Sequence, residues 1–460
     1  MNAPGASRRS AVGTLPERHP LAVLIAIGVI FALAYGASLV VLRKPGGQIV
    51  VGDALGHYVQ LRSVVFDRDL QFKNEYARLH GVSEEAIEAV SAGERMTPTD
   101  HIRNYMPFGP ALLWAPLFLA VTAVVWIANL FGAGYPLDGF ARAFQATPGF
   151  SGIAAACAGS CLAYLAARRL VDRDAAIWAT LAVWLSSSTL YYSLVSPTYS
   201  HAASMLVVSG FWFVWIATLD RQTTARYAAT GALAGAAALM RWQDAVLLAI
   251  PAIEAVCRLR RFGAGGSAAR ILAASSAAGV AFAPQMAVWT VLYGSPMVIP
   301  QGSAFMRWSE PALWPVLLSD NHGLLTWTPV VAVSLAGLVP LVRRHAPIGA
   351  AAIGFVAITW YVNAAVADWW GGEAFGARRF ISCYPIFVLG LAALFAELRR
   401  PIAMKTIASA FTAYTLLLLL QYQAFMHGLR QVVPYPRGFV DLWLWRLRAP
   451  FDLLQWWLER

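Results

Sequence analysis

Charged residues are scarce in this 460-residue sequence, because Asp, Glu, Lys and Arg together make up 13% of the chain while 58% of its residues are hydrophobic. The mean hydropathy of +0.57 is far above that of a soluble globular domain. Apolar runs of about 17 to 25 residues recur, the length that a helix needs to cross a bilayer, whereas the alternating pattern of a β-barrel is missing. The sequence therefore predicts an all-α, polytopic membrane protein.

Cysteines and several catalytic motifs are also scarce or missing. The four cysteines, at positions 157, 161, 257 and 383, have no CxxC spacing, so neither a disulfide framework nor a zinc site is expected. No Walker loop, GxGxxG after a strand, HExxH or GxSxG occurs, which leaves nucleotide hydrolysis, dinucleotide chemistry and zinc proteolysis without support. The first apolar run, Leu21 to Leu42, is too long for a signal-peptide core and lacks a cleavage pattern, so we expect a retained span.

The net charge of +11 is carried mostly by arginine, which outnumbers lysine 32 to 3. These residues form five short clusters that follow every second apolar run, as expected for cytoplasmic loops, and this distribution speaks against nucleic-acid binding. The clusters are Arg168/Arg169/Arg173, Arg221/Arg226, Arg258/Arg260/Arg261/Arg270, Arg343/Arg344 and Arg399/Arg400/Lys405. If all five are cytoplasmic, the loops at 43–108, 293–324 and 367–380 face the exterior.

The apolar runs predict about 11 to 13 transmembrane helices between residues 21 and 425. A parity conflict arises between residues 109 and 167, where two spans would leave Arg168 outside if the N-terminus is cytoplasmic and residue 53 external. Either one run is split or re-entrant, or the Arg168 cluster breaks the charge rule. We expect a cytoplasmic tail over 1–20, a transmembrane domain over 21–425, and an external tail over 426–460 with an interfacial helix.

The segment IVVGDALGHYVQLRS, residues 49–63, places Asp53 at the start of an amphipathic juxtamembrane helix in the long first external loop. His57 follows one turn later, so a carboxylate and an imidazole are expected together just outside the bilayer. A second short helix is expected after Ser83, whose side chain can cap it. The alternative role of Asp53 is that of a helix cap, since a carboxylate at a helix start suits the free N–H groups and the dipole.

The segment VADWWGGEAFGARRF, residues 366–380, gathers several candidate binding residues at one external membrane edge. Trp369 and Trp370 alone would suit an aromatic belt. Arg378 and Arg379 run against the charge rule on an external loop, and they need an anionic partner such as a lipid phosphate. Together with Glu373, these residues form a candidate substrate-binding set.

Arg241, in ALMRWQDAVLL, is a third candidate, because a charge between two short apolar runs is costly and is usually paired or functional. The structural alternative is an ion pair with Asp244 at i+3. His201 in SPTYSHAAS, His322 in SDNHGLLTWTP and Tyr105 in NYMPFGPALLW lie in external loops and complete the set. For the two histidines, a polar contact at a helix end is the alternative.

Three motifs together resemble the GT-C class of polytopic glycosyltransferases, which includes protein O-mannosyltransferases and the aminoarabinose transferase of lipid A. They are VGDALGHYVQLRS in the first external loop, the proline-rich NYMPFGPALLWAPL, and GALAGAAALMRWQDAVLLAIP, which is similar to a Gly-rich span ending in a basic residue. NHGLLTWTP and WWGGEAFGARRF further resemble uncharacterised bacterial membrane proteins of this kind. The resemblance covers roughly residues 20–400.

The resemblance implies a bacterial inner-membrane enzyme with its active site facing the periplasm. Such an enzyme moves a sugar from a polyprenyl-phosphate donor to a glycan, lipid or protein acceptor. On this analogy Asp53 corresponds to the acid of loop one, which is a candidate general base or acceptor-orienting residue. Arg241 matches the basic residue of the class, with Arg378 and Arg379 as rivals for binding the leaving phosphate.

The sequence departs from the class at Ala54, where many relatives have a second acid. A metal site with paired carboxylates is therefore not expected, although Asp100 or Glu75 could contribute from elsewhere in the loop, and we expect no metal and no cofactor. The alternative function is a transporter or flippase of lipid-linked sugars. A transporter would show an internal repeat of broken helices, and the two halves of the sequence show no clear repeat.

Overall fold

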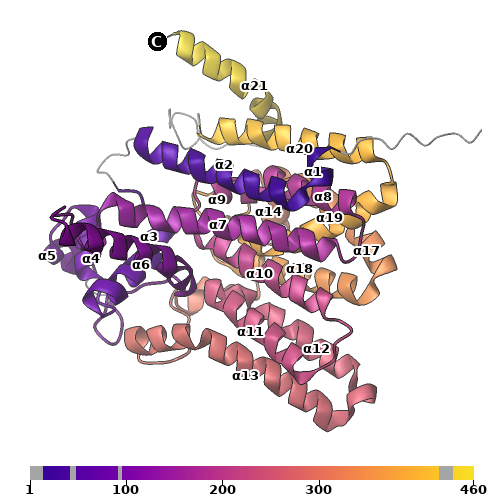
Figure 1. The fold of residues 1–460 in the computed structure, drawn as a ribbon, viewed down its shortest axis with the longest axis horizontal. Coiled ribbons are helices and arrows are strands. Elements are labelled where there is room, and N and C mark those ends of the chain that lie inside the picture. Colours follow the sequence, from indigo (N-terminus) through magenta and orange to yellow (C-terminus); the bar gives the residue numbers. More distant parts are fainter. Residues whose placement is uncertain (1–13, 42–47, 92–95, 424–438, 460) are drawn as a thin grey trace, which may run out of the picture.

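The computed structural model describes residues 14–41, 48–91, 96–423 and 439–459, whose fold is drawn in Figure 1. The model is 76% helical. Two isolated bridges, Met96 with Ile102 and Met306 with Val366, are the β pairing that these residues contain. The predicted all-α class is therefore confirmed.

Eight helices are long and apolar enough to cross a membrane, judged by length and composition, so the chain is a multi-pass membrane protein. They are α2 (Pro20–Val41), α6 (Gly109–Leu130), α7 (Arg142–Ala167), α10 (Ser200–Ala217), α13 (Leu259–Tyr293), α18 (Ala346–Ala365), η5 (Arg378–Cys383) continuing into α19 (Tyr384–Leu398), and α20 (Pro401–Gln421). The remaining predicted runs are helical but shorter or broken. They form α8 (Arg173–Ser186) with α9 (Ser188–Leu194), α11 (Thr224–Met240), η3 (Trp242–Leu248) with α12 (Ala249–Cys257), and α15 (Leu324–Trp327), α16 (Val330–Ala336) and α17 (Leu338–Arg344).

All five basic clusters lie at one end of the bundle, here called the basic end. The second and third clusters meet at Glu254, which pairs with Arg226 at 2.9 Å and with Arg258 at 3.3 Å. Members of the first, fourth and fifth clusters line one cavity, namely Arg168, Arg169, Arg344 and Arg399. Another cavity, lined by Arg258 and by Pro347 at the start of α18, joins the two groups. The arginine pattern therefore identified connections that lie together in space.

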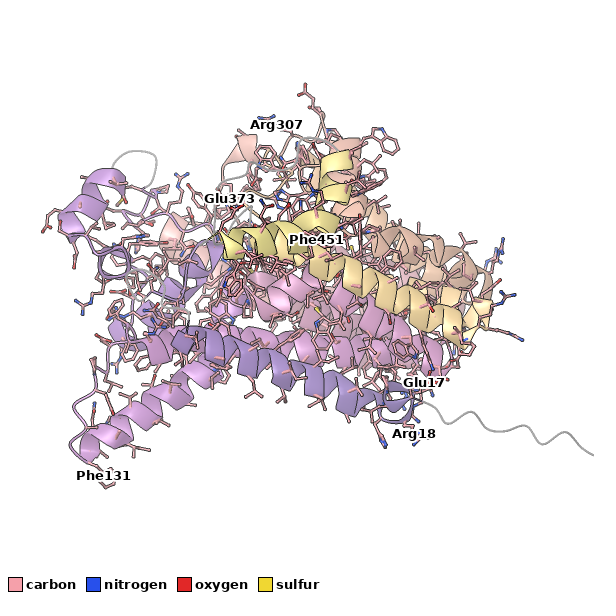
Figure 2. The ribbon with its side chains drawn as sticks, turned by 90° about the horizontal axis from the view of Figure 1, so that it is seen from above. Glu17, Arg18, Phe131, Arg307, Glu373 and Phe451 are labelled. Carbon is pink, nitrogen blue, oxygen red and sulfur yellow. The ribbon has the colours of Figure 1, made fainter. Side chains whose placement is uncertain are left out.

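Helix α6 does not reach the basic end. Helix α3 (Asp53–Arg62) contacts the carbonyl oxygen of Pro107, just before α6, at 2.8 Å, and that of Gly139, just after it, at 2.5 Å. Figure 2 shows the tip of α6, at Phe131, far from the end of the molecule where Arg18 lies. The chain thus leaves and returns at the same end, and α7 is the next helix to run to the basic end. This path is the one that the re-entrant alternative requires, and on it the parity conflict would not arise.

The first long loop, which precedes α6, packs at the opposite end, here called the site end, as α3, the π-helical η2 (Ser63–Asp67), α4 (Lys73–His80) and α5 (Glu84–Ser91). Arg62 joins these elements, because its guanidinium pairs with Asp67 and, at 2.9 Å, with the fully buried Glu75, while its Nε donates to the carbonyl of Asp138 at 3.0 Å. The predicted cap of α5 is confirmed, since Ser83 Oγ accepts from the N–H of Ala86 at 3.2 Å.

Glycines fix the contact between α11 and α13. A Cβ atom on Gly231 would lie 2.1 Å from the carbonyl oxygen of Ala274, and one on Gly235 would lie 2.2 Å from that of Ala278. Close helix approach through small residues is typical of membrane bundles. Because α11 ends at Met240, this contact sets the position of the residue that follows it.

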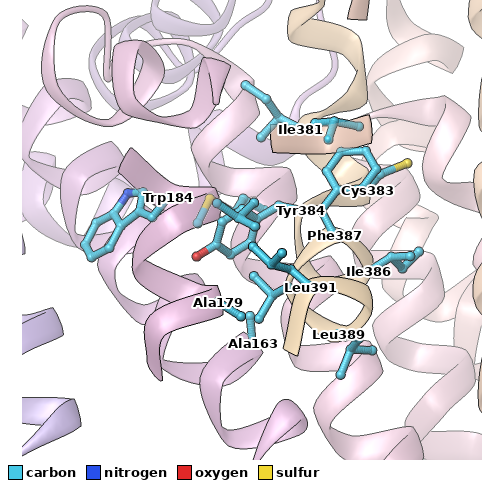
Figure 3. Close-up of a cluster of buried hydrophobic side chains, with 14 of the residues drawn as sticks. Ala163, Ala179, Trp184, Ile381, Cys383, Tyr384, Ile386, Phe387, Leu389 and Leu391 are labelled. Atoms are coloured by element: carbon cyan, nitrogen blue, oxygen red, sulfur yellow. The ribbon is translucent and has the colours of Figure 1, made fainter. Parts of the chain in front are cut away.

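The core lies around α19, where the side chains of Tyr384, Phe387 and Leu391 are buried against α7 and α8 (Figure 3). Tyr384 Oη hydrogen bonds with Ser160 Oγ at 3.2 Å. The helix therefore holds η5, which precedes it, on a well-packed base. At the other end of the chain, α21 (Phe439–Leu458) forms the helix predicted for the tail, while residues 426–438 lie outside the described residues.

Candidate active site

Asp53 is the first residue of α3 and forms an ion pair with Arg378, with 2.8 Å between its Oδ2 and the guanidinium nitrogen. Asp53 is 40% exposed and Arg378 14% exposed. The turn before the helix requires glycine, because Gly52 has φ 60° and a Cβ there would lie 2.5 Å from the hydroxyl of Tyr199. Gly52, and not Asp53, occupies the N-cap position. The contact that Asp53 makes is thus across the fold, between the first long loop and η5.

The two adjacent arginines of η5 point to different partners. The guanidinium of Arg378 lies 5.5 Å from the ring centroid of Tyr199 in addition to its contact with Asp53. Arg379 donates to Asp368 twice, at 2.6 Å to the carbonyl oxygen and at 2.8 Å to Oδ1. Arg379 therefore closes the 366–377 hairpin, while Arg378 faces the first loop.

Arg241 is the C-cap residue of α11 and has an extended backbone, with φ −152° and ψ 118°. Its guanidinium contacts Nδ1 of His201 and donates to Gln243 Oε1 at 3.3 Å. Gln243 in turn donates to the carbonyl of Arg379 at 3.2 Å, which links this group to η5. The alternative of an ion pair with Asp244 is wrong, because that carboxylate accepts instead from Ser204 at 2.5 Å.

The two histidines expected near these charges are both buried. His57 is fully buried, with Nδ1 2.8 Å from the carbonyl of Pro107 and its ring 5.7 Å from that of Trp114. Burial lowers the pKa of His57 to about 4, although the backbone contact opposes the shift. His201 is 3% exposed and lies edge-on to Tyr192, with 4.6 Å between ring centroids. His57 is thus held neutral behind the helix face that carries Asp53.

The remaining predicted residues surround this cluster. His322 is buried in a left-handed conformation, φ 65°, with its ring 4.8 Å from that of Trp327. Burial lowers its pKa to about 4, opposed by a hydrogen bond with the backbone of Trp370. The rings of Trp369 and Trp370 form an edge-on pair at 5.7 Å. Of this group, Trp370 is 38% exposed and is the one best placed to meet a lipid surface.

Two cavities flank the ion pair. One, of about 530 Å³, is lined by Asp53 and Tyr105 and covered by residues of α4 and α5. The other, of about 540 Å³, lies between the end of α2 and the start of α10, and its lining includes Tyr199 and Glu373. Figure 2 shows Glu373 at the surface of the site end. Asp53 and Tyr199 thus stand between two separate spaces.

Several site residues escaped the sequence reasoning. Tyr199 stacks on His201 and lies under Arg378, and burial raises the pKa of its hydroxyl to about 12. Asp368 and Gln243 hold the arginines in place. The sequence signal that could have identified Tyr199 is its position two residues before His201 in SPTYSHAAS. A tyrosine in a loop between apolar runs is more simply interpreted as part of an aromatic belt.

Glu75 and Asp100 do not join Asp53. Glu75 pairs with Arg62 inside the first loop, and Asp100 is an exposed residue with φ 60°. Over the described ranges, no group of three or more His, Cys, Asp or Glu side chains is arranged to hold a metal ion. In the described residues neither acid is therefore grouped with Asp53, and whether the chain needs a metal stays a prediction.

No family model matches the chain, and no curated protein matches its sequence. Among solved structures, the chain is similar to the oligosaccharyltransferase AglB from Archaeoglobus fulgidus in complex with an inhibitory peptide and a dolichol-phosphate. The identity is 12% and the TM-score 0.48, over 88% of this chain and 55% of AglB. It is also similar to ArnT from Cupriavidus metallidurans bound to undecaprenyl phosphate, with 16% identity and a TM-score of 0.48, over 96% of this chain and 70% of ArnT.

A second structure of the Archaeoglobus fulgidus oligosaccharyltransferase, in complex with Zn and sulfate, matches with 12% identity and a TM-score of 0.45, over 90% of this chain and 58% of that enzyme. The chain thus spans little more than half the length of the matched oligosaccharyltransferases. These enzymes and ArnT are GT-C glycosyltransferases, the class that the sequence motifs resemble. At these identities and TM-scores the similarity is one of overall fold and assigns no residue role or substrate.

Proposed function

We propose that this chain is a membrane glycosyltransferase that moves a sugar from a polyprenyl-phosphate donor to a hydroxyl of a glycan, lipid or protein acceptor. The reaction takes place at the site end, on the outer face of a bacterial inner membrane. One observation carries the proposal. Arg241 makes no direct ion pair with any described carboxylate, and Asp244 and Asp53 attract its guanidinium only from beyond contact distance. A partly buried guanidinium is costly unless an anion pairs with it, and the phosphate of the donor would be such an anion.

Asp53 acts as the general base in this proposal. A hydroxyl is a poor nucleophile until its proton is removed as the new bond forms, and a positioned carboxylate can accept that proton. Arg378 holds one oxygen of Asp53, and among the described residues the carboxylate has no other polar contact. The second oxygen is therefore available to an acceptor that enters the 530 Å³ cavity.

Arg241 and Arg378 act on the leaving group. As the acceptor oxygen bonds to the anomeric carbon, the bond from that carbon to the phosphate oxygen breaks, and the electron pair stays on the lipid phosphate. Positive groups placed where this charge develops stabilise the transition state. Planar guanidinium groups suit the task, since they can hold two phosphate oxygens at once. The donor enters through the 540 Å³ cavity beside α2. Helix α2 exposes apolar side chains on the outside of the bundle, where the lipid would lie.

The experiment that tests this proposal is an in vitro transfer assay with the purified full chain in proteoliposomes and a panel of radiolabelled polyprenyl-phosphate sugars. The assay measures both labelled acceptor and released polyprenyl phosphate. We expect transfer with at least one donor, and a loss of at least tenfold in the Arg241→Gln variant. Arg307→Gln is the matched control, because Arg307 is an exposed arginine at the same end (Figure 2).

The alternative function gives a different result in the same vesicles. A flippase would move the labelled donor between leaflets without releasing polyprenyl phosphate. Donor movement with no release from any member of the panel would overturn the proposal and favour transport. Equal losses in Arg241→Gln and Arg307→Gln would show that Arg241 has no special part in the reaction.

A further inference from the structure

The cavity at the basic end has the composition of an anion site. It measures about 670 Å³ and is lined by four arginines that come from three separate connections of the chain. Arg168 and Arg169 follow α7, Arg344 ends α17, and Arg399 follows α19. Glu17 and Arg18 lie at the same end of the molecule (Figure 2). The side chain of Arg173, at the start of α8, donates to the carbonyl oxygen of Arg18.

Two aspartates, Asp172 and Asp174, also line the cavity, so they offset two of its four arginine charges and leave two. Asp172 caps α8, where it accepts from the N–H groups of Asp174 at 3.1 Å and Ala175 at 2.9 Å. Glu397 pairs with Arg344 at 3.0 Å, but both side chains are well exposed, so water screens the pair. The Arg169 and Arg399 side chains make no hydrogen bond or ion pair with the described residues. The cavity therefore has an excess of positive charge.

Arg399 occupies a backbone position that favours glycine. It is the C-cap residue of α19 with φ 48° and ψ 26°, in the left-handed region. Residues without a Cβ adopt this conformation most easily, and arginine gains nothing there from the backbone. An arginine stands there nonetheless, and it lines the cavity.

Apolar side chains complete the lining. Leu170 and Val171 are half-buried and open to the cavity, whereas Phe395, at 0% exposed, and Met404, at 5%, are core residues that form its floor. A soluble anion would use the guanidinium groups alone. An amphiphile with a phosphate group would use the arginines for its headgroup and the half-buried Leu170 and Val171 for the start of its hydrocarbon chains.

We propose that this cavity binds the phosphate headgroup of an anionic phospholipid from the leaflet at the basic end. Basic pockets between membrane helices on the cytoplasmic side suit such headgroups, and arginine is well matched to phosphate. The site is remote from Asp53 and Arg241, so it does not depend on the proposed transferase activity. Its arginines come from different connections, so a bound lipid ties α7, α17 and α19 together.

The chain offers a matched test, because an exposed arginine stands next to two of the cavity residues in the sequence. Arg343 and Arg400 are exposed and do not line the cavity. The double variant Arg344→Gln/Arg399→Gln and the control Arg343→Gln/Arg400→Gln therefore remove the same charge from the same loops. Native mass spectrometry of the detergent-solubilised full chain, titrated with phosphatidylglycerol, gives the apparent Kd of each.

We expect the cavity variant to raise the apparent Kd roughly 30-fold, from about a fivefold effect for each guanidinium lost, and the control to stay within about threefold of wild type. Phosphatidylcholine should bind weakly to all three proteins. Equal losses in both double variants would overturn the proposal, since binding would then follow overall charge. Unchanged binding in both would overturn it too.

Two further measurements cover folding and the source of the phosphate. If the cavity variant does not fold, as judged by gel filtration and circular dichroism, the single change Arg169→Gln replaces it. This change is expected to raise the Kd about fivefold against Arg400→Gln. Soluble glycerol phosphate is titrated as a competitor. If it displaces phosphatidylglycerol at equal concentration, the site takes a free anion and the lipid assignment is wrong.

Discussion

The carboxylate of Asp53, at the start of α3 in the first long loop, lies 2.8 Å from the guanidinium of Arg378, at the start of the segment that continues into α19. Two regions far apart in the chain thus bring a carboxylate and a guanidinium into contact. Neither is buried enough for the pair to stabilise the fold strongly, because a partly exposed ion pair contributes about 0 to 1 kcal/mol. The role proposed for this pair is therefore in the transfer reaction and not in stabilising the fold.

Asp53→Asn should fold normally and lower the rate of sugar transfer by about 10² to 10⁴-fold, because the amide cannot accept the proton. A purely structural role predicts nearly normal transfer, since asparagine also suits a helix start. The measurement is the transfer rate between pH 6 and 8. Asp100→Asn is the control, as Asp100 is exposed in the same loop. A normal rate in Asp53→Asn would show that Asp53 is not the base.

Arg378→Lys should reduce kcat at least tenfold, because lysine cannot hold two phosphate oxygens. Arg379→Lys should have a smaller effect on kcat, because Arg379 is occupied by Asp368 and holds the hairpin. Kinetics at varied donor concentration separate kcat from KM. If Arg241→Lys and both of these changes leave transfer untouched, the phosphate site lies elsewhere.

Arg62→Leu should destabilise the protein by about 3 to 5 kcal/mol, because the buried Glu75 would lose its partner. The double change Arg62→Leu/Glu75→Leu should recover much of this loss, since no buried charge then remains unpaired at that position. Thermal unfolding in detergent measures both. A double variant as unstable as the single one would mean that the other Arg62 contacts, with Asp67 and Asp138, matter more.

His57 makes stability depend on pH between about 4 and 6.5. Burial lowers its pKa to about 4 in the folded protein, against about 6.5 in the unfolded chain. In that window the unfolded chain binds a proton that the folded protein does not, so stability falls as the pH falls, by an amount on the order of 3 kcal/mol. His57→Gln removes this effect. We expect the unfolding midpoint of wild type to drop faster than that of His57→Gln below pH 6.5, and parallel curves would refute it.

Cysteine labelling tests the arrangement of the helices. In a background without native cysteines, Asp100→Cys and Phe131→Cys should react with a membrane-impermeant reagent from one side, and Arg343→Cys from the other. Phe131 is the sensitive position, since an α6 that crossed the membrane would place it with Arg343. Labelling of Asp100→Cys and Arg343→Cys from the same side would contradict the whole topology.

Much of the fold could be predicted because composition and charge act over whole segments. Runs of apolar residues gave the helices, and the arginine clusters gave the basic end. Helix α6 could not be placed in this way, since it is as apolar as a crossing helix, with a hydropathy of 2.2. Its path is set by the contacts of α3 with Pro107, just before α6, and with Gly139, just after it. These contacts form only when the first long loop has packed.

The site was predicted as a set of residues but not as a set of contacts. The pattern Arg241/Asp244 suggests an ion pair only if the backbone between them is helical, because that spacing brings side chains together on a helix. Arg241 has an extended backbone, so its side chain turns toward His201 instead. The pairing of Asp53 with Arg378 depends on the left-handed turn at Gly52, and no local spacing encodes such a contact.

The glycine contact between α11 and α13 has a consequence for how sequence change reaches the site. Adding one methyl group at Gly231 or Gly235 would push the two helices apart, because it would meet the backbone of α13. Arg241 is rigidly attached to the end of α11, so its guanidinium would shift with the helix. Natural variation at these two positions should therefore alter donor affinity without touching the donor, and a compensating change would have to arise on α13.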